Sequence, residues 1–204
     1  MKFQTHDFDQ CARAARIEVA RCRLRMSLSR GREDLGQESF QDIALEGVSS
    51  IVTVFEMAVV EALLEVATSM TGGIPEPMKD ISFKAARSDI ERTWKTRSDF
   101  VHNWLGLDWA HAEWFSKWMG YVECRNAWAH GRGRLTPRQE SAGVLTQLAV
   151  AGIAQDRGRV RLESSAPLEA AEVGDRLLIS LEPALLRSRS VDVSVESRKQ
   201  VGLG

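Results

Sequence analysis

Cysteine is scarce in this sequence, and its spacing excludes a role in cross-linking the chain. The three cysteines, Cys11, Cys22 and Cys124, form no CxxC pair and leave an odd number. Disulfide frameworks use even, regularly spaced sets, whereas unpaired thiols are typical of a reducing compartment. We therefore expect free thiols and a cytoplasmic protein.

A long uncharged hydrophobic run is also missing. The most apolar stretch, residues 51–68, contains Glu56, Glu61 and Glu65, and charged side chains are costly in the hydrocarbon core of a bilayer. The N-terminal residues are polar and acidic and do not resemble the apolar core of a signal peptide. These absences predict a soluble protein without a membrane partner.

The sequence has no charge excess of either sign and none of the common nucleotide-binding or hydrolase motifs. The formal net charge is -1, so no global basic field predicts nucleic-acid binding, although arginines cluster locally within residues 13–32 and 125–138. GxxxxGK(S/T), GxGxxG and GxSxG are absent. The spacing of His102, His111 and Cys124 matches no familiar zinc site. We expect neither a metal nor a cofactor.

Two long stretches without proline predict amphipathic helices. In residues 7–30, apolar side chains recur at steps of three and four between arginines, which predicts a helix with a basic outer face. That face is either solvated or in contact with RNA. Residues 38–70, in which Gly47 could cause an interruption, predict the central core helix or a dimerisation helix. Their apolar stripe consists of Val48, Val52, Phe55, Val59, Ala62 or Leu63, and Val66.

The middle of the chain predicts further helices and an aromatic core. Residues 81–100 show a weaker helical periodicity, and residues 108–130 predict a helix that ends at Gly131-Arg132-Gly133. All six tryptophans lie between residues 94 and 128. Clustered tryptophans stack on bases or pack in cores and interfaces, and packing is the commoner use. We expect these tryptophans to pack.

The C-terminal part differs in its pattern. Thr136-Pro137-Arg138-Gln139 has the form of a capping box and predicts the start of another helix. Residues 159–162 and 176–181 then predict two short strands, because turn signals at 156–158 and 174–175 precede apolar runs or overlap them.

These elements predict a mainly α fold, a helical bundle with a small C-terminal β-hairpin-like appendage. The length fits one such domain. The expected parts are an N-terminal helix (residues 1–37), a helical core (38–152), a strand-rich appendage (153–187) and a loose polar tail (188–204).

The main concentration of chemically active side chains lies at the end of the helix predicted at 108–130. The segment reads Arg125-Asn126-Ala127-Trp128-Ala129-His130-Gly131. Asn126 and His130 are four residues apart and share one helical face, and the long side chain of Arg125 can swing toward it. The negative end of the helix dipole favours a protonated imidazole there. An accessible histidine beside a permanent cation and a carboxamide suits phosphodiester chemistry.

This pattern of an arginine, four residues and a histidine, with asparagine after the arginine and glycine after the histidine, resembles the signature of HEPN domains. The resemblance covers about residues 38–150 and implies a helical bundle of HEPN type that dimerises, so that two motifs face one cleft. Many members of that family are metal-independent endoribonucleases. The resemblance thus implies a toxin-like or defence effector that cleaves RNA as a homodimer without a cofactor, and it leaves room for a regulatory protein partner.

The resemblance also implies roles for the motif. His130 would act as general base on a ribose 2′-hydroxyl or as general acid on the leaving 5′-oxygen. Arg125 would hold the scissile phosphate and stabilise its developing charge, and Asn126 would orient the histidine or bind the phosphate. The product would be a 2′,3′-cyclic phosphate, and DNA, which lacks the nucleophile, would not be cleaved. The RNA backbone would be bound by the arginines that follow the motif, Arg132, Arg134 and Arg138.

One departure and two alternatives accompany this assignment. In HEPN toxins that a nucleotidyltransferase partner silences, a tyrosine lies two residues beyond the histidine, and this chain has Arg132 there. Some HEPN domains are non-catalytic dimerisation or ligand-binding modules, and an arginine and a histidine near a helix end can form an ordinary polar cap.

Cys124 lacks the histidine and aspartate pattern of an activated nucleophile, so we expect a buried thiol.

Overall fold

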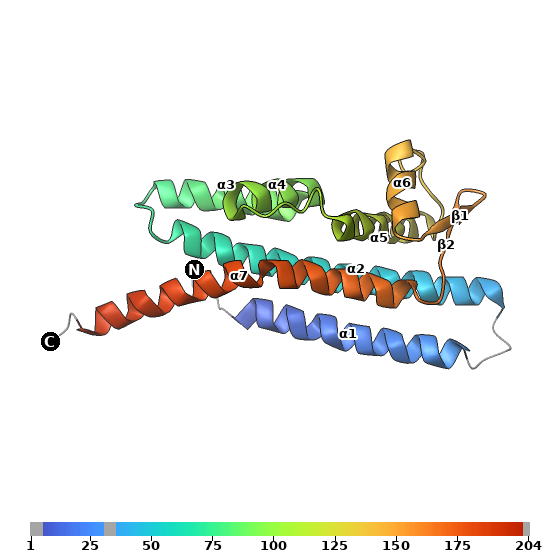
Figure 1. Cartoon of the computed structure of the whole chain (residues 1–204), viewed down its shortest axis with the longest axis horizontal. Coiled ribbons are helices and arrows are strands. Elements are labelled where there is room, and N and C mark those ends of the chain that lie inside the picture. The colour runs from blue at the N-terminus through green and yellow to red at the C-terminus, as the bar shows by residue number, and fades with distance from the viewer. Residues whose placement is uncertain (1–5, 31–35, 202–204) are drawn as a thin grey trace.

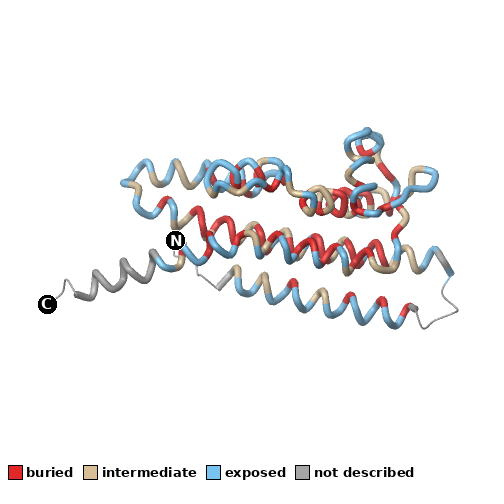
Figure 2. The backbone as a smooth tube through the Cα atoms, in the orientation of Figure 1, coloured by how far each residue is buried: buried red, intermediate tan, exposed pale blue. Residues whose placement is uncertain are grey.

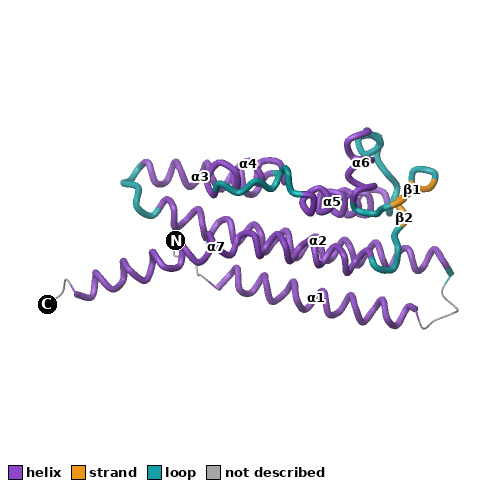
Figure 3. Tube along the Cα trace, in the orientation of Figure 1, coloured by secondary structure: helices purple, strands orange, loops and turns teal. Residues whose placement is uncertain are grey.

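The computed structural model describes residues 6–30 and 36–201, with residues 6, 7, 30, 37 and 191–201 described by their backbone alone. It is mainly helical, with a two-stranded antiparallel sheet (Figures 1 and 3). The helices are α1 (His6–Arg30), α2 (Gln37–Thr71), α3 (Met78–Arg92), α4 (Trp94–Leu105), α5 (Glu113–Gly131), α6 (Ala142–Val150) and α7 (Ala166–Val201). The strands are β1 (Ala154–Asp156) and β2 (Arg159–Arg161). The prediction of a mainly α protein with a small hairpin is confirmed.

Helix α2 is the centre of the molecule. The helices α1, α7, α5 and α3 all pack against it, and buried positions follow it along most of its length (Figure 2). The predicted apolar stripe is confirmed, because Val48, Val52, Phe55, Val59, Ala62, Leu63 and Val66 are at most 2% exposed. Gly47 does not interrupt the helix. A Cβ atom there would lie 2.8 Å from Sγ of Cys22, so the glycine permits the close approach of α1.

Among the described helices, α2 alone is long and apolar enough to cross a membrane by length and composition. Half of its most apolar 18-residue window is buried inside the protein. Burial of this kind is typical of the core helix of a soluble protein, with which the fold is compatible.

Helices α3 and α4 replace the single helix predicted over residues 81–100. Thr93, which has an extended backbone (φ -145°, ψ 162°), separates them and begins α4 with a capping box. Thr93 Oγ1 accepts a hydrogen bond from the backbone N–H of Thr96, and Thr96 Oγ1 accepts one from the N–H of Thr93, each at 3.1 Å. Because this reciprocal bonding stabilises a helix start, it ends α3 and begins α4 within the predicted helix.

The tryptophan-rich region packs in the core, as predicted, for five of its six members. Trp94, Trp109 and Trp118 are at most 5% exposed, and Trp114 and Trp128 are half-buried and pack against the core. Trp104 is the exception at 36%, where it stacks on Phe100 with ring centroids 5.3 Å apart.

The helix start predicted at Thr136 is wrong. Residues 136–140 form a turn, and α6 begins at Ala142. The side chain of Gln139 is buried, and its Nε2 donates to the backbone oxygen and to Oε2 of Glu123 on α5, at 2.8 and 2.9 Å. Gln139 therefore holds the turn against α5 and does not begin a helix.

Strand β2 confirms the strand predicted at 159–162, but its partner differs from the prediction. It pairs with β1, with Gln155 opposite Val160, and the turn between the strands falls at Arg157-Gly158 as predicted. The side chain of Gln41 on α2 bonds both the N–H and the C=O of Leu162 at 2.8 Å. The hairpin is thereby held against the start of α2.

Helix α7 contradicts the strand predicted at 176–181 and the loose tail predicted from residue 188. It extends from Ala166 to Val201 and packs along α2 (Figure 1). Its buried side chains recur at helical spacing: Ala170, Val173, Leu177, Leu181, Ala184, Leu185 and Ser188. The run at 176–181 resembles a strand only because two residues outside the buried face of the helix are also apolar. These are Leu178, which is half-buried, and Ile179, which is exposed.

Gly174 lies within α7 and is not the predicted turn. A Cβ atom there would lie 2.6 Å from the ring of Phe55, so the glycine permits α7 to approach α2. Helix α7 thus packs with α2 in one core, although sequence analysis assigns the two helices to different parts of the chain.

Candidate functional site

Helix α5 carries the motif and is anchored in the core by aromatic packing. Trp118 is fully buried and packs edge-on against Phe55 of α2 and Trp94 of α4, with ring centroids 6.4 and 5.4 Å apart. Each such pair contributes about 1 kcal/mol beyond burial alone. Cys124 and Ala127 are also fully buried, so the rotation of α5 about its axis is fixed up to the motif.

Helix α5 ends where predicted, but Arg132, not a glycine, first adopts the left-handed conformation (φ 48°, ψ 48°). The N–H of Arg132 donates to the carbonyl of Trp128, and the N–H of Gly133 donates to that of Ala127, both at 3.0 Å. The first of these bonds is that of the αL motif, which ends a helix at a left-handed residue. His130 therefore lies in the last turn, where the terminal carbonyls give the helix end a partial negative charge.

Asn126 and His130 share the accessible side of these last turns, as their spacing predicts. His130 is exposed and Asn126 is half-buried. Neither side chain forms a hydrogen bond or an ion pair within the part of the chain that the structure describes. Both are available to a ligand.

Arg125 points to a different side of α5. At about 100° per residue, Arg125 and His130 lie about 140° apart around the helix axis. Nη2 of Arg125 lies 2.8 Å from Oε2 of Glu56 on α2, and the arginine side chain is 25% exposed. No hydrogen bond or ion pair among the described residues joins the side chain of Arg125 to that of Asn126 or His130. One copy of the chain thus brings the asparagine and the histidine together but not the arginine.

Glu56 binds two guanidinium groups. Its Oε1 accepts from Nη1 of Arg97 at 2.6 Å and its Oε2 from Arg125 at 2.8 Å. The side chain of Arg97, on α4, is 6% exposed. Its Nε donates to the carbonyl of Ile90 at 2.6 Å, and its guanidinium lies 4.7 Å from the ring centroid of Trp94. This Glu56 cluster, formed by Glu56, Arg97 and Arg125, ties α2, α4 and α5 together beneath the motif.

Sequence analysis identifies neither Glu56 nor Arg97 as part of the site. A signal exists for Arg97, because it shares helical spacing with Trp94 and Val101, both buried. An arginine on a buried face requires an acidic or carbonyl partner. Glu56 follows Phe55 in the apolar stripe, and only the packing of α4 and α5 determines that its carboxylate meets two arginines.

The three arginines predicted to bind RNA are separated in the structure. Arg132 lines a small pocket with the hairpin and the start of α2. Arg134 is exposed, and its backbone forms a bridge with Arg159 of β2. Arg138 is 83% exposed and lies 3.6 Å from the buried carboxylate of Glu123. Arg132 and Arg134 thus lie beside the hairpin, whereas Arg138 is paired with α5.

Cys124 does not have the properties of a nucleophile. Burial raises the pKa of its thiol from 9.0 to about 12, so the thiol stays protonated at neutral pH. Within residues 6–30 and 36–201, no group of three or more His, Cys, Asp or Glu side chains could hold a metal ion. The candidate site therefore consists of Arg125, Asn126 and His130, with Glu56 and Arg97 behind them.

A family assignment depends on the motif, its place at the end of an anchored helix and the helical bundle around it. Comparison of the chain with protein-family models, curated proteins and solved structures finds no match. The assignment to the HEPN type stays a prediction.

Proposed function

We propose that this protein is a metal-independent endoribonuclease in which His130 transfers protons at the open end of α5. The observation that carries the proposal is the exposed imidazole of His130, one turn from Asn126, on a helix that is otherwise anchored in the core. A histidine that makes no structural bond with the described residues is available to accept and donate protons.

In the proposed reaction the ribose 2′-hydroxyl attacks the adjacent phosphorus. His130 removes the hydroxyl proton, and an imidazolium donates a proton to the leaving 5′-oxygen. Arg125 stabilises the negative charge that builds on the phosphate, and Asn126 orients the imidazole or bonds a phosphate oxygen. The products are a 2′,3′-cyclic phosphate and a 5′-hydroxyl. Because the nucleophile belongs to the RNA, the mechanism needs no metal to generate a hydroxide.

A homodimer completes the site in this proposal. Arg125 and His130 diverge around α5, so a second copy facing the first would supply an arginine and a second imidazole across a shared cleft. One histidine then acts as the base and the other as the acid. By family analogy, the protein is a toxin-like or defence effector in the cytoplasm, held inactive by a regulatory protein partner until a signal arrives.

The test is an RNA cleavage assay in EDTA on a mixed RNA pool. Wild type should leave cyclic-phosphate ends and should not cut DNA of the same sequence. His130→Ala should lower the rate about 10²- to 10⁴-fold, the usual contribution of a general acid or base. His111→Ala is the matched control, because His111 is 86% exposed, bonds Asp108 and precedes the start of α5. Intact RNA with wild type, or equal cleavage by His130→Ala, would contradict the proposal.

The Glu56 cluster favours a second candidate function, a non-catalytic helical dimerisation module in which Arg125 is structural. Removing one partner of a largely buried ion pair lowers stability, so Arg125→Ala should lower the unfolding temperature in either case. His130→Ala should leave that temperature within about 2 °C, because an exposed side chain without partners contributes little. A wild type that cuts no RNA, together with a lowered unfolding temperature of Arg125→Ala, would favour the module.

A further inference from the structure

The loop that follows α5 is joined to the β-hairpin by backbone hydrogen bonds. The N–H of Leu135 donates to the carbonyl of Gly158 at 2.8 Å, and the N–H of Val160 donates to the carbonyl of Gly133 at 2.9 Å. The end of the motif-bearing helix and the hairpin therefore form one backbone unit, although α6 separates them in the sequence.

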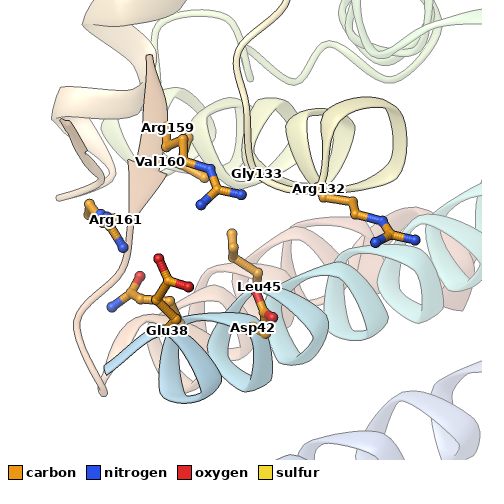
Figure 4. A pocket seen from close by; sticks show the side chains of 9 residues that line it. Glu38, Asp42, Leu45, Arg132, Gly133, Arg159, Val160 and Arg161 are labelled. Carbon is orange, nitrogen blue, oxygen red and sulfur yellow. The ribbon is translucent and has the colours of Figure 1, made fainter. Parts of the chain in front are cut away.

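A pocket of about 70 Å³ lies between this unit and the first turns of α2. Three arginines line it, Arg132 from the end of α5 and Arg159 and Arg161 from β2. Glu38 and Asp42 line the side formed by α2. In Figure 4, Arg159 points from the hairpin into the space above α2, with Arg161 beside it and Glu38 across from both, whereas the side chain of Arg132 extends to the right, away from the other two arginines.

The positive charge in this pocket is only partly compensated. Arg161 lies 3.7 Å from Asp156 of β1. Neither Arg132 nor Arg159 forms an ion pair with another described residue. The Nε of Arg159 is buried and has no hydrogen-bond partner. Because Arg132 and Arg159 have no counter-charge among the described residues, the pocket has positive charge that a ligand with several acceptor oxygens would compensate.

We propose that this arginine pocket, formed by Arg132, Arg159 and Arg161, binds a backbone phosphate of the RNA strand beside the scissile one, an inference that rests on the proposed function. Guanidinium groups bond phosphate oxygens through paired N–H donors. Arg132 lies two residues beyond His130, so a strand held at His130 passes over Arg132 toward the hairpin. The hairpin thereby extends the substrate site beyond the motif.

Glu38 and Asp42 affect whether the pocket would bind the phosphate or the base of a nucleotide. Carboxylates repel a phosphate, but they accept hydrogen bonds from the N–H groups of a base. Three arginines line the pocket against these two carboxylates, and two of the arginines, Arg132 and Arg159, have no ion-pair partner among the described residues. This excess of positive over negative charge favours a phosphate over a base.

The test is the binding of a fluorescein-labelled RNA oligonucleotide, measured by anisotropy over a salt series. All proteins carry His130→Ala, which prevents cleavage. We expect Arg159→Gln to weaken binding about tenfold and to reduce the slope of log K against log salt by about 0.7, the value for one phosphate contact to a single strand. Arg161→Gln should act in the same direction. Arg92→Gln, which removes an equal charge from the exposed end of α3, should change binding less than about twofold.

Glu38→Gln distinguishes a phosphate from a base. Removing a carboxylate that repels a phosphate should strengthen binding about two- to threefold. Weaker binding would show that the carboxylate accepts from a base, and it would overturn the phosphate assignment. A DNA oligonucleotide of the same sequence should show the same dependence on Arg159, because both backbones carry phosphates.

The outcomes separate this inference from the proposed function. If wild type leaves RNA intact while binding still depends on Arg159, the nuclease proposal fails and the arginine pocket stands. If Arg159→Gln and Arg92→Gln weaken binding equally, or if the His130→Ala protein binds no RNA at low salt, the arginine pocket is overturned. Thermal unfolding of each variant checks that it is folded, and Arg161→Gln replaces Arg159→Gln if the latter is not.

Discussion

At the scale of single residues, the shared carboxylate of Glu56 distinguishes this site from an ordinary helix end. Arg97 is almost fully buried, and no other acidic side chain among the described residues pairs with it. Its charge therefore depends on Glu56. Arg125 is more exposed and uses the second carboxylate oxygen. The same carboxylate thus compensates a core cation and positions an arginine of the motif.

Replacing Glu56 with glutamine is expected to lower the free energy of unfolding by about 2–3 kcal/mol, because Arg97 would lose its counter-charge in the core. This is below the about 3–5 kcal/mol typical of fully buried pairs, since the side chain of Glu56 is 21% exposed. Glu46→Gln is the matched control on the same helix. Glu46 pairs with Arg25 at 3.2 Å but is 55% exposed, and its loss should cost less than about 1 kcal/mol. Urea denaturation measures both, and equal losses would contradict the buried role of Glu56.

The part of the site that is local in sequence could be predicted, and the part that depends on packing could not. Asn126 and His130 lie on one helix, so their spacing alone places them on one side. Arg97 and Glu56 are separated by 41 positions, and their contact arises only when α4 packs beside α2. The arginine pocket is non-local in the same way, because it combines α5, the hairpin and α2.

At the scale of elements, the predictions that rest on long helical periodicity are confirmed. The helices predicted at 7–30, 38–70 and 108–130 correspond to α1, α2 and α5. The failures concern residues whose local signal has a second physical cause. Gly174 has the composition of a turn, but it is needed for close packing of two helices. The Thr136–Gln139 pattern resembles a helix cap, but its glutamine bonds α5.

Gly174→Ala is expected to lower the unfolding temperature although alanine favours helices. The added Cβ would lie 2.6–2.8 Å from three ring carbons of Phe55. Overpacking of this kind costs about 1–3 kcal/mol, against a gain of about 1 kcal/mol in helix propensity. Gly143→Ala in α6 is the control, because nothing lies within 4 Å of its added Cβ. Its unfolding temperature should stay the same or rise. Stabilisation by both substitutions would show that α7 does not pack closely on α2.

At the scale of the whole molecule, α7 makes the bundle a single unit. It forms the most extensive helix–helix contact with α2, and α1 packs on the same central helix. A segment limited to residues 38–152 would lack both of these layers. The packed bundle is therefore larger than the segment 38–152 that sequence analysis assigns to the helical core.

A chain truncated after Ser165 is expected to lose cooperative unfolding. It would expose the face of α2 that α7 covers and would lose buried side chains such as Leu177 and Leu181. Each buried leucine contributes about 2–5 kcal/mol, compared with about 5–15 kcal/mol of total stability for a typical domain. Thermal melts followed by near-ultraviolet circular dichroism measure this. Truncation after Ser190 keeps the described packing of α7 and should retain a cooperative transition. A cooperative transition in the shorter chain would instead support a separate core.

The hydrogen bonds between the loop after α5 and the hairpin also determine when conformational entropy is lost. The last turn of a helix opens readily when nothing follows it. Here Gly133 is bonded to Val160 and lies so close to α2 that a Cβ atom would be 3.0 Å from Leu45. The helix end that carries His130 is thus ordered during folding, before any substrate arrives. In the proposed reaction, ordering of this kind would lower the entropic cost of reaching a reactive geometry, and residues that never touch the reacting atoms would supply it.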